Sequence, residues 1–236
     1  MGRSPWARSE NPSQGGTAGQ RADRRRRRLV SAAALTGTGL LGASLSTEPD
    51  STEFYALTFA VAGTWLAGGL ASGPVPLHSV QTDKRSVGRE VIIPLLTGAA
   101  AFGGFFGAAL LARRIPVLNE ALTSVLSYAD RGSDPLVLVT TLSIGVAEEV
   151  FFRGALYSAL GVHDPVPVST ALYMLATCAT RNPALVIASG VMGGLFAVQR
   201  RTSGGIQAPI LTHLTWSALM LRYLPSLFHG PTTSLD

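Results

Sequence analysis

The feature that most constrains this chain is a charged motif inside an apolar stretch long enough to cross a bilayer. Residues 137–160 read VLVTTLSIGVAEEVFFRGALYSAL, and Glu148, Glu149 and Arg153 are their charged residues. An acidic side chain inside a membrane is costly and by default marks a functional site. The order Glu149 then Arg153, one helical turn apart, favours an ion pair. Glu148 points about 100° around the helix from Glu149, so we predict that it is free for chemistry.

The rest of the sequence agrees with an integral membrane protein. Of its 236 residues, 47% are hydrophobic and 14% are charged, whereas a soluble domain carries about 25% charged residues. We count about seven apolar segments that could form transmembrane helices. They cover residues 29–45, 54–72, 91–112, 137–160, 166–180, 183–198 and 207–224. The sequence therefore predicts an all-α fold, a polytopic bundle of transmembrane helices in a lipid bilayer.

Composition divides the chain into four parts. Residues 1–28 are polar and basic, and we expect a disordered cytoplasmic tail. Residues 29–133 are expected to form three transmembrane helices and then an amphipathic segment at the membrane interface. Residues 134–224 form the predicted core around the charged motif, and residues 225–236 form a short polar tail. Within the core, Gln199 to Arg201 are predicted to lie between the last two transmembrane helices, 183–198 and 207–224.

The arginine run Arg24 to Arg28 directly precedes the first apolar segment. Basic residues beside a transmembrane helix favour the cytoplasmic side, so we expect a multipass protein of the cell membrane with a cytoplasmic N-terminus. Arg113, Arg114 and Arg131 then fall on the outer side, against this rule. A twin-arginine export signal, cleaved near Ala43, is the alternative interpretation of the first segment.

The net charge of +5 comes from the basic tail and from loops, so it predicts no nucleic-acid partner. Cys178 is the only cysteine, which excludes a disulfide within the chain. The abundance of arginine, alanine and glycine points to a bacterial source with a GC-rich genome.

Two further pairs of polar residues lie one helical turn apart in later apolar segments. His213 and Ser217 share one face of the segment 207–224, and Tyr173 and Thr177 share one face of the segment 166–180. A serine or threonine in a membrane helix is usually satisfied by the backbone alone. For His213, a functional role depends instead on whether it lies beside an unpartnered intramembrane glutamate.

The order of these motifs resembles a known family. Glu148-Glu149-x-x-x-Arg153 is followed about sixty residues later by a glycine-rich segment, a short basic turn and the sequence APILT before His213. This pattern is similar to the CPBP family of intramembrane proteases, the CAAX prenyl protease and bacteriocin-processing family. That family includes the type II prenyl-protein endopeptidases, and the resemblance covers residues 134–222.

The resemblance implies roles for the residues that match the family's first and last motifs. Glu148 corresponds to the catalytic base, and Glu149 and Arg153 are the remaining residues of its motif, which we expect to support the helix. His213 matches the histidine of the last motif, His-x-x-x-Asn. Ser217 stands where that motif has asparagine, and its hydroxyl can still donate a hydrogen bond.

The family's middle motif, Phe-x-x-x-His, falls by position on Tyr173 and Thr177. The histidine, which in active members helps the glutamate to hold the catalytic water, is thus replaced by Thr177. Threonine can bond a water but cannot share a proton as imidazole does. Glu148, His213, Ser217 and Thr177 are therefore the candidate catalytic residues.

The leading hypothesis is a glutamate-dependent intramembrane endopeptidase. Its substrate would be a hydrophobic peptide or membrane protein, embedded in the membrane or close to it, with or without a prenyl group. Catalytic zinc takes three protein ligands, whereas this core offers one histidine and two acids, one of them paired with arginine. We therefore expect neither a metal nor another cofactor.

Two alternatives come from other functional classes. The absence of the middle histidine suggests a catalytically impaired member of the family that acts as a membrane scaffold or an immunity factor. A proton-coupled transporter that uses Glu148 is the weaker alternative, because the sequence has no visible internal repeat of the kind many transporters have. Neither the oligomeric state nor the identity of the substrate follows from the sequence.

Overall fold

Helices make up all the regular secondary structure in the part of the chain that the structure describes. The computed structural model describes residues 12–77, 87–132 and 134–228. The elements in chain order are α1 (Pro12–Ser44), α2 (Thr52–Ala71), α3 (Val87–Ala112), α4 (Pro116–Arg131), α5 (Asp134–Glu148), the π-helix η1 (Glu149–Leu156), α6 (Tyr157–Ala159), α7 (Pro165–Thr177), the 3-10 turn η2 (Cys178–Thr180), α8 (Pro183–Ser203), α9 (Gln207–Tyr223) and the 3-10 turn η3 (Pro225–Leu227). The predicted all-α fold is confirmed.

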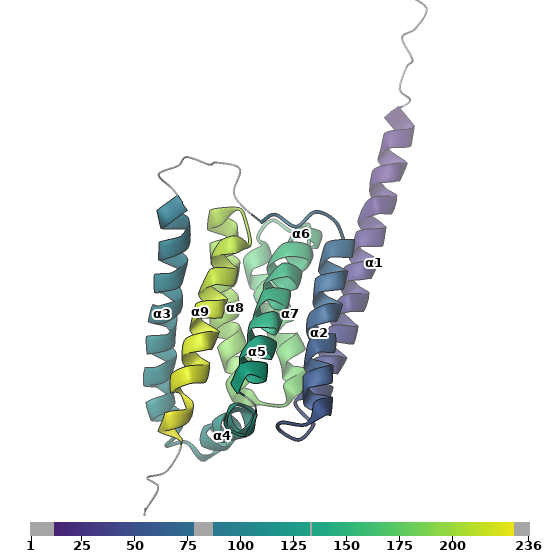
Figure 1. Cartoon of the computed structure of the whole chain (residues 1–236). Coiled ribbons are helices and arrows are strands. Elements are labelled where there is room, and N and C mark those ends of the chain that lie inside the picture. Colours follow the sequence, from purple (N-terminus) through teal and green to yellow (C-terminus); the bar gives the residue numbers. More distant parts are fainter. Residues whose placement is uncertain (1–11, 78–86, 133, 229–236) are drawn as a thin grey trace, which may run out of the picture.

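The long helices run side by side as one bundle, with α1 and α2 at one edge and α3 at the other (Figure 1). α1 packs on α2, α7 on α8, and α3 on α9. By length and composition, four described segments can cross a membrane: Thr52–Ala71, Gly88–Ala112, Pro135–Ala159 and Pro183–Ser203. The chain is therefore a multipass membrane protein, and the total of about seven spans stays a prediction.

The structure differs from the prediction at two helix boundaries. The sequence predicts a disordered tail over residues 1–28, but α1 is helical from Pro12 and runs without a break into the first apolar segment. The sequence predicts that the sixth apolar helix ends at Val198, but α8 includes Gln199 to Arg201 and continues to Ser203. Arginine and glutamine are good helix formers, and basic residues in a last turn complement the helix dipole. Residues 1–11 lie outside the described part.

Close approach of helices builds the core beside the charged motif. Trp65 of α2 is fully buried and packs against Phe151 and Phe152 of η1. A Cβ atom at Gly37 of α1 would run into the Trp65 ring, so only glycine lets α1 approach α2 this closely. The buried aromatic cluster fixes η1 against the first two helices.

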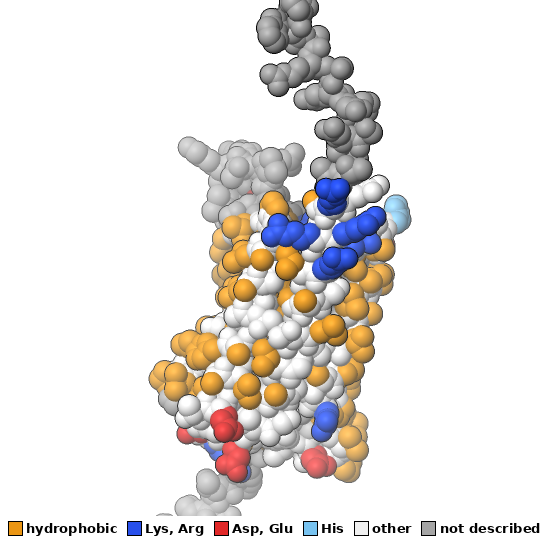
Figure 2. All heavy atoms as spheres, turned by 90° about the vertical axis from the view of Figure 1, so that its right-hand side faces the viewer, with side chains coloured by type: hydrophobic (Ala, Val, Ile, Leu, Met, Phe, Trp, Pro, Cys, Tyr) orange, Lys and Arg blue, Asp and Glu red, His pale blue; other side chains and the backbone are white. Residues whose placement is uncertain are grey.

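α4 lies across one end of the bundle, where the sequence predicts an amphipathic segment (Figure 1). The Tyr128 hydroxyl of α4 donates to the Thr47 carbonyl at 2.6 Å, and the Asn182 side-chain amide donates to the Ala121 carbonyl at 2.7 Å. On the face shown in Figure 2, arginine side chains gather at the opposite end, and aspartate and glutamate lie at the end of α4 together with a few arginines. The two ends therefore differ in charge.

Candidate functional site

Glu148 lies at the junction where α5 gives way to η1. The change from α-helix to π-helix begins at the next residue, and all eight residues of η1 are buried. Single π-helical turns are rare and occur frequently at functional sites. The irregular turn sets the relative directions of Glu148, Glu149 and Arg153, which an ideal α-helix would direct differently.

Glu149 and Arg153 form a buried ion pair. Arg153 Nη1 lies 3.2 Å from Glu149 Oε1, and both side chains are 0% exposed. Arg153 Nη2 also donates to the Gly193 carbonyl of α8 at 3.2 Å. The guanidinium group lies 4.5 Å from the centre of the Tyr173 ring and 5.2 Å from that of Phe196, which favours its burial through cation–π contact.

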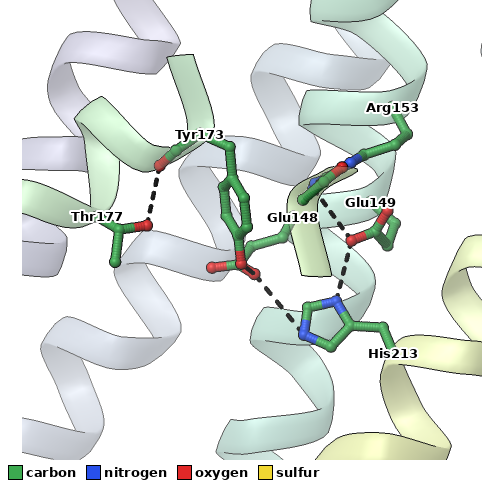
Figure 3. Close-up of polar contacts among 7 residues, drawn as sticks. Glu148, Glu149, Arg153, Tyr173, Thr177 and His213 are labelled. Atoms are coloured by element: carbon green, nitrogen blue, oxygen red, sulfur yellow. Dashed lines mark hydrogen bonds and ion pairs between the residues drawn. The ribbon is translucent and has the colours of Figure 1, made fainter. Parts of the chain in front are cut away.

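His213 of α9 lies between the two glutamates (Figure 3). Its Nδ1 is 3.0 Å from Glu149 Oε1, within hydrogen-bonding distance, and its Nε2 is 3.8 Å from Glu148 Oε2. The Phe196 ring stacks on the imidazole with centroids 4.7 Å apart. The ring is thus fixed by a carboxylate on one edge and an aromatic face, and its other edge is directed at Glu148.

Glu148 has a partner that the local sequence spacing does not reveal. The Tyr173 hydroxyl of α7 donates to Glu148 Oε2 at 2.5 Å. Both side chains are buried, and Glu148 is 7% exposed. The prediction that Glu148 lacks a local partner is correct only for its own helix, because the hydrogen-bond donor comes from a neighbouring one.

Ser217 and Thr177 are both buried near this group. Ser217 lies one turn after His213 on α9. The Thr177 hydroxyl donates to the carbonyl of Tyr173 in its own helix at 2.9 Å, the usual state of a threonine in a membrane helix. The single hydroxyl proton of Thr177 is therefore donated within α7.

One cavity of about 330 Å³ joins the four candidate catalytic residues. Glu148, His213, Ser217 and Thr177 all line it, together with Tyr173. The structure thus brings the sequence-predicted residues to one place, although their catalytic roles stay a prediction. Among the described residues, no group of three or more His, Cys, Asp or Glu side chains is arranged to hold a metal ion.

The cavity extends from Glu148 towards the end of the bundle that α4 covers. Val125 and Tyr128 of α4 line it, as do Leu185 near the start of α8 and Leu224 just after α9. Most of this wall is apolar. In the other direction the fully buried residues Phe152, Arg153 and Phe196 lie between Glu148 and the end that carries the arginine run.

Two residues near the site escaped the sequence analysis. Arg200 of α8 donates through Nε to the Arg153 carbonyl at 3.0 Å, and its guanidinium lies 5.2 Å from the Tyr157 ring centre. Arg200 thus adds a side-chain donor to a backbone carbonyl of the π-helical turn. Gly193 provides the close backbone approach to Arg153. Neither contact follows from spacing along one helix.

Comparison with known proteins gives a family match. Residues 132–219 match the family model described as "Type II CAAX prenyl endopeptidase Rce1-like". No curated protein and no solved structure matches the chain. The matched segment runs from the end of α4 to the second half of α9, so it contains every candidate site residue.

Proposed function

We propose that this chain, a member through residues 132–219 of the CPBP family of CAAX-protease-like membrane proteins, is a glutamate-dependent endopeptidase. Its substrate is a hydrophobic peptide segment in the membrane or at its surface. The observation that carries the proposal is the meeting of Glu148 and His213, which come from distant parts of the sequence, at the wall of one cavity, with Nε2 3.8 Å from Oε2.

The proposed reaction uses water as the nucleophile. Glu148 takes a proton from the water, whose oxygen attacks the peptide carbonyl carbon, and the same proton passes to the leaving amine. His213 and Ser217 face the oxygen that becomes negatively charged, where donors lower the barrier most. Because Nδ1 of His213 donates to Glu149 at 3.0 Å, Nε2 of the neutral ring can accept from the water, and only the imidazolium form can donate from Nε2 to this oxyanion.

Glu149 and Arg153 act by positioning in this proposal. Their buried ion pair connects η1 to α9 through His213 and to α8 through the Gly193 carbonyl. Removing one partner of such a pair leaves an uncompensated buried charge. We therefore assign these two residues to the support of the site and not to proton transfer with substrate.

Hydrolysis of defined peptides by the purified protein tests the proposal. Hydrophobic peptides with and without a prenyl group are incubated with the protein in detergent micelles, and the products are identified by mass spectrometry. Replacing the base should lower kcat by about 10²–10⁴-fold. We expect this for Glu148→Gln, which keeps the side-chain shape. Glu53→Gln changes an exposed carboxylate at the start of α2 and should keep full activity. Equal activity of Glu148→Gln and the unchanged protein would contradict the mechanism.

A second candidate function is peptide or partner binding without hydrolysis, as a scaffold or an immunity factor. It is favoured by Thr177, whose hydroxyl is bonded within α7 where the family has a histidine. A protein that binds hydrophobic peptide but does not cleave it, and that gains activity on Thr177→His, would support this function. Cleavage by the unchanged protein would exclude it.

We further propose that the N-terminus lies in the cytoplasm. The basic end of the molecule holds the arginine run of α1 together with Arg200 and Arg201 of α8, and the acidic loop between α1 and α2 lies at the other end. Basic residues that flank transmembrane helices favour the cytoplasmic side. In this orientation the cavity extends towards the outer side of the membrane.

A further inference from the structure

Tyr173 occupies a special place in the site because its hydroxyl bonds the proposed base. The hydroxyl donates to Glu148 Oε2 at 2.5 Å, and the residue is 8% exposed. Its ring is held in turn, with its centroid 4.5 Å from the Arg153 guanidinium and 4.9 Å from the Phe152 ring centroid. Figure 3 shows the side chain reaching from α7 to Glu148. A side chain whose ring is held by two such contacts places its hydroxyl precisely enough to orient a carboxylate.

Thr177, one turn further along α7, does not provide this contact. Its hydroxyl proton goes to the Tyr173 carbonyl. Thr177, at the position where the family has a histidine, therefore donates no hydrogen bond to Glu148. The hydroxyl that reaches Glu148 from α7 belongs to Tyr173, at the position where the motif has phenylalanine.

We propose that Tyr173 is a positioning residue that holds Glu148, a task that an imidazole at position 177 would share. This inference rests on the proposed hydrolysis at Glu148. The Tyr173 hydroxyl donates to Oε2 at 2.5 Å, whereas Nε2 of His213, at 3.8 Å, lies beyond hydrogen-bonding distance of it. Oε2 is thereby anchored, and the other oxygen, Oε1, is left to take the proton from water. Tyr173 keeps its own proton throughout the reaction.

The substitution Tyr173→Phe removes the hydroxyl and keeps the ring against Arg153. A hydrogen bond to a charged group contributes enough that its loss should lower kcat by about ten- to a hundredfold. KM should change little, because the hydroxyl contacts the base and not the substrate. Tyr223→Phe is the matched control, since Tyr223 is 48% exposed at the end of α9. Full activity of Tyr173→Phe would overturn the inference.

A double-mutant cycle separates positioning from a general effect on packing. In the background of Thr177→His, an imidazole is available for the same task, so Tyr173→Phe should cost less than about threefold in kcat. A loss of equal size in both backgrounds would overturn the claim that the two positions share one task. The melting temperatures of all variants are measured alongside.

A chemical readout tests the contact independently of catalysis. Dicyclohexylcarbodiimide modifies carboxyl groups in apolar surroundings, and mass spectrometry can locate the modified glutamate. Loss of the hydrogen bond to Oε2 should raise the rate of Glu148 modification several-fold in Tyr173→Phe and leave it unchanged in Tyr223→Phe. An unchanged rate would overturn the inference even if hydrolysis is observed. If the unchanged protein cleaves no peptide, the proposed function fails, and the labelling still decides whether Tyr173 controls Glu148.

Discussion

The carboxylate of Glu149 holds the imidazole of His213, with Oε1 3.0 Å from Nδ1. The same oxygen is 3.2 Å from Nη1 of Arg153. Glu149 therefore does more than stabilise its own helix, which is the role that its spacing from Arg153 predicts. It connects η1 to α9 and directs Nε2 of His213 towards Glu148. In other hydrolytic sites, a carboxylate behind a histidine fixes its tautomer and orientation in the same way.

Glu149→Gln should reduce activity by disturbing the orientation of His213. The amide keeps the shape of the side chain but loses the charge shared by Arg153 and His213. Hydrogen bonds to charged groups contribute about 1.5–3 kcal/mol each, so we expect kcat to fall by about ten- to a hundredfold. Steady-state kinetics on a cleaved peptide measure this, with Glu120→Gln on the exposed face of α4 as the control. A decrease in KM alone would contradict the assignment.

A buried and an exposed arginine–carboxylate pair should differ in their effect on stability. Arg153 and Glu149 are 0% exposed, whereas the side chains of Arg201 and Asp164 are 53% and 49% exposed. Arg153→Met leaves Glu149 buried without its cation and should lower the free energy of unfolding by about 3–5 kcal/mol. Arg201→Met should lower it by at most about 1 kcal/mol. Denaturant titration in mixed micelles compares the two, and equal losses would mean that the buried pair contributes no more than the surface pair.

The sequence predicts those parts of the site that lie on one helix. Glu149 lies one turn before Arg153, and His213 lies one turn before Ser217. That the two members of each pair share a helix face therefore follows from helical geometry. The resemblance to a family added the order of the motifs. With both, four of the residues that line the cavity could be named, although the catalytic role of each is still to be tested.

The contacts between helices could not be predicted in the same way. Whether Tyr173 or Thr177 reaches Glu148 depends on the rotation of α7 against η1, and hydrophobic periodicity does not resolve a single turn. The π-helical turn changes the repeat after Glu148, which a pattern with a period of about 3.6 residues misses. The sequence places Arg200 in a basic turn, because it follows an apolar run. In the structure its partner is the backbone carbonyl of Arg153, and no sequence pattern marks such a contact.

Two adjacent glycines of α8 provide a test of the packing behind Tyr173. A Cβ atom at Gly193 would lie 3.0 Å from Tyr173 Cδ1 and 3.2 Å from Arg153 Nη2, whereas nothing lies within 4 Å of one at Gly194. Because Tyr173 and Arg153 are both held by other contacts, Gly193→Ala should shift them and lower both activity and melting temperature. Gly194→Ala removes a flexible residue from a helix and should leave activity unchanged, with a stability gain of up to about 1 kcal/mol. Similar effects of the two substitutions would show that the contact with Gly193 is not needed.

Cysteine labelling can determine from which side of the membrane the cavity is reached. Cys178 is exposed and is first replaced by serine. In this background Thr141→Cys places a thiol in the cavity wall, and Val139→Cys places one on the outer surface of the same helix, where Val139 is 50% exposed. A charged thiol reagent enters a water-filled cavity but does not partition into hydrocarbon.

We expect the charged reagent to modify Thr141→Cys when it is added outside intact cells and to leave Val139→Cys unmodified. Thr202→Cys, exposed at the basic end of α8, should react only in inverted membrane vesicles. The reason is that the cavity runs from Glu148 to residues of α4, away from the arginine run. If Thr141→Cys and Thr202→Cys react from the same side, the cavity is reached from the arginine-bearing side instead, and substrate must approach Glu148 past η1. If all three cysteine variants behave as expected, a peptide substrate has to present its scissile bond from the outer side of the membrane.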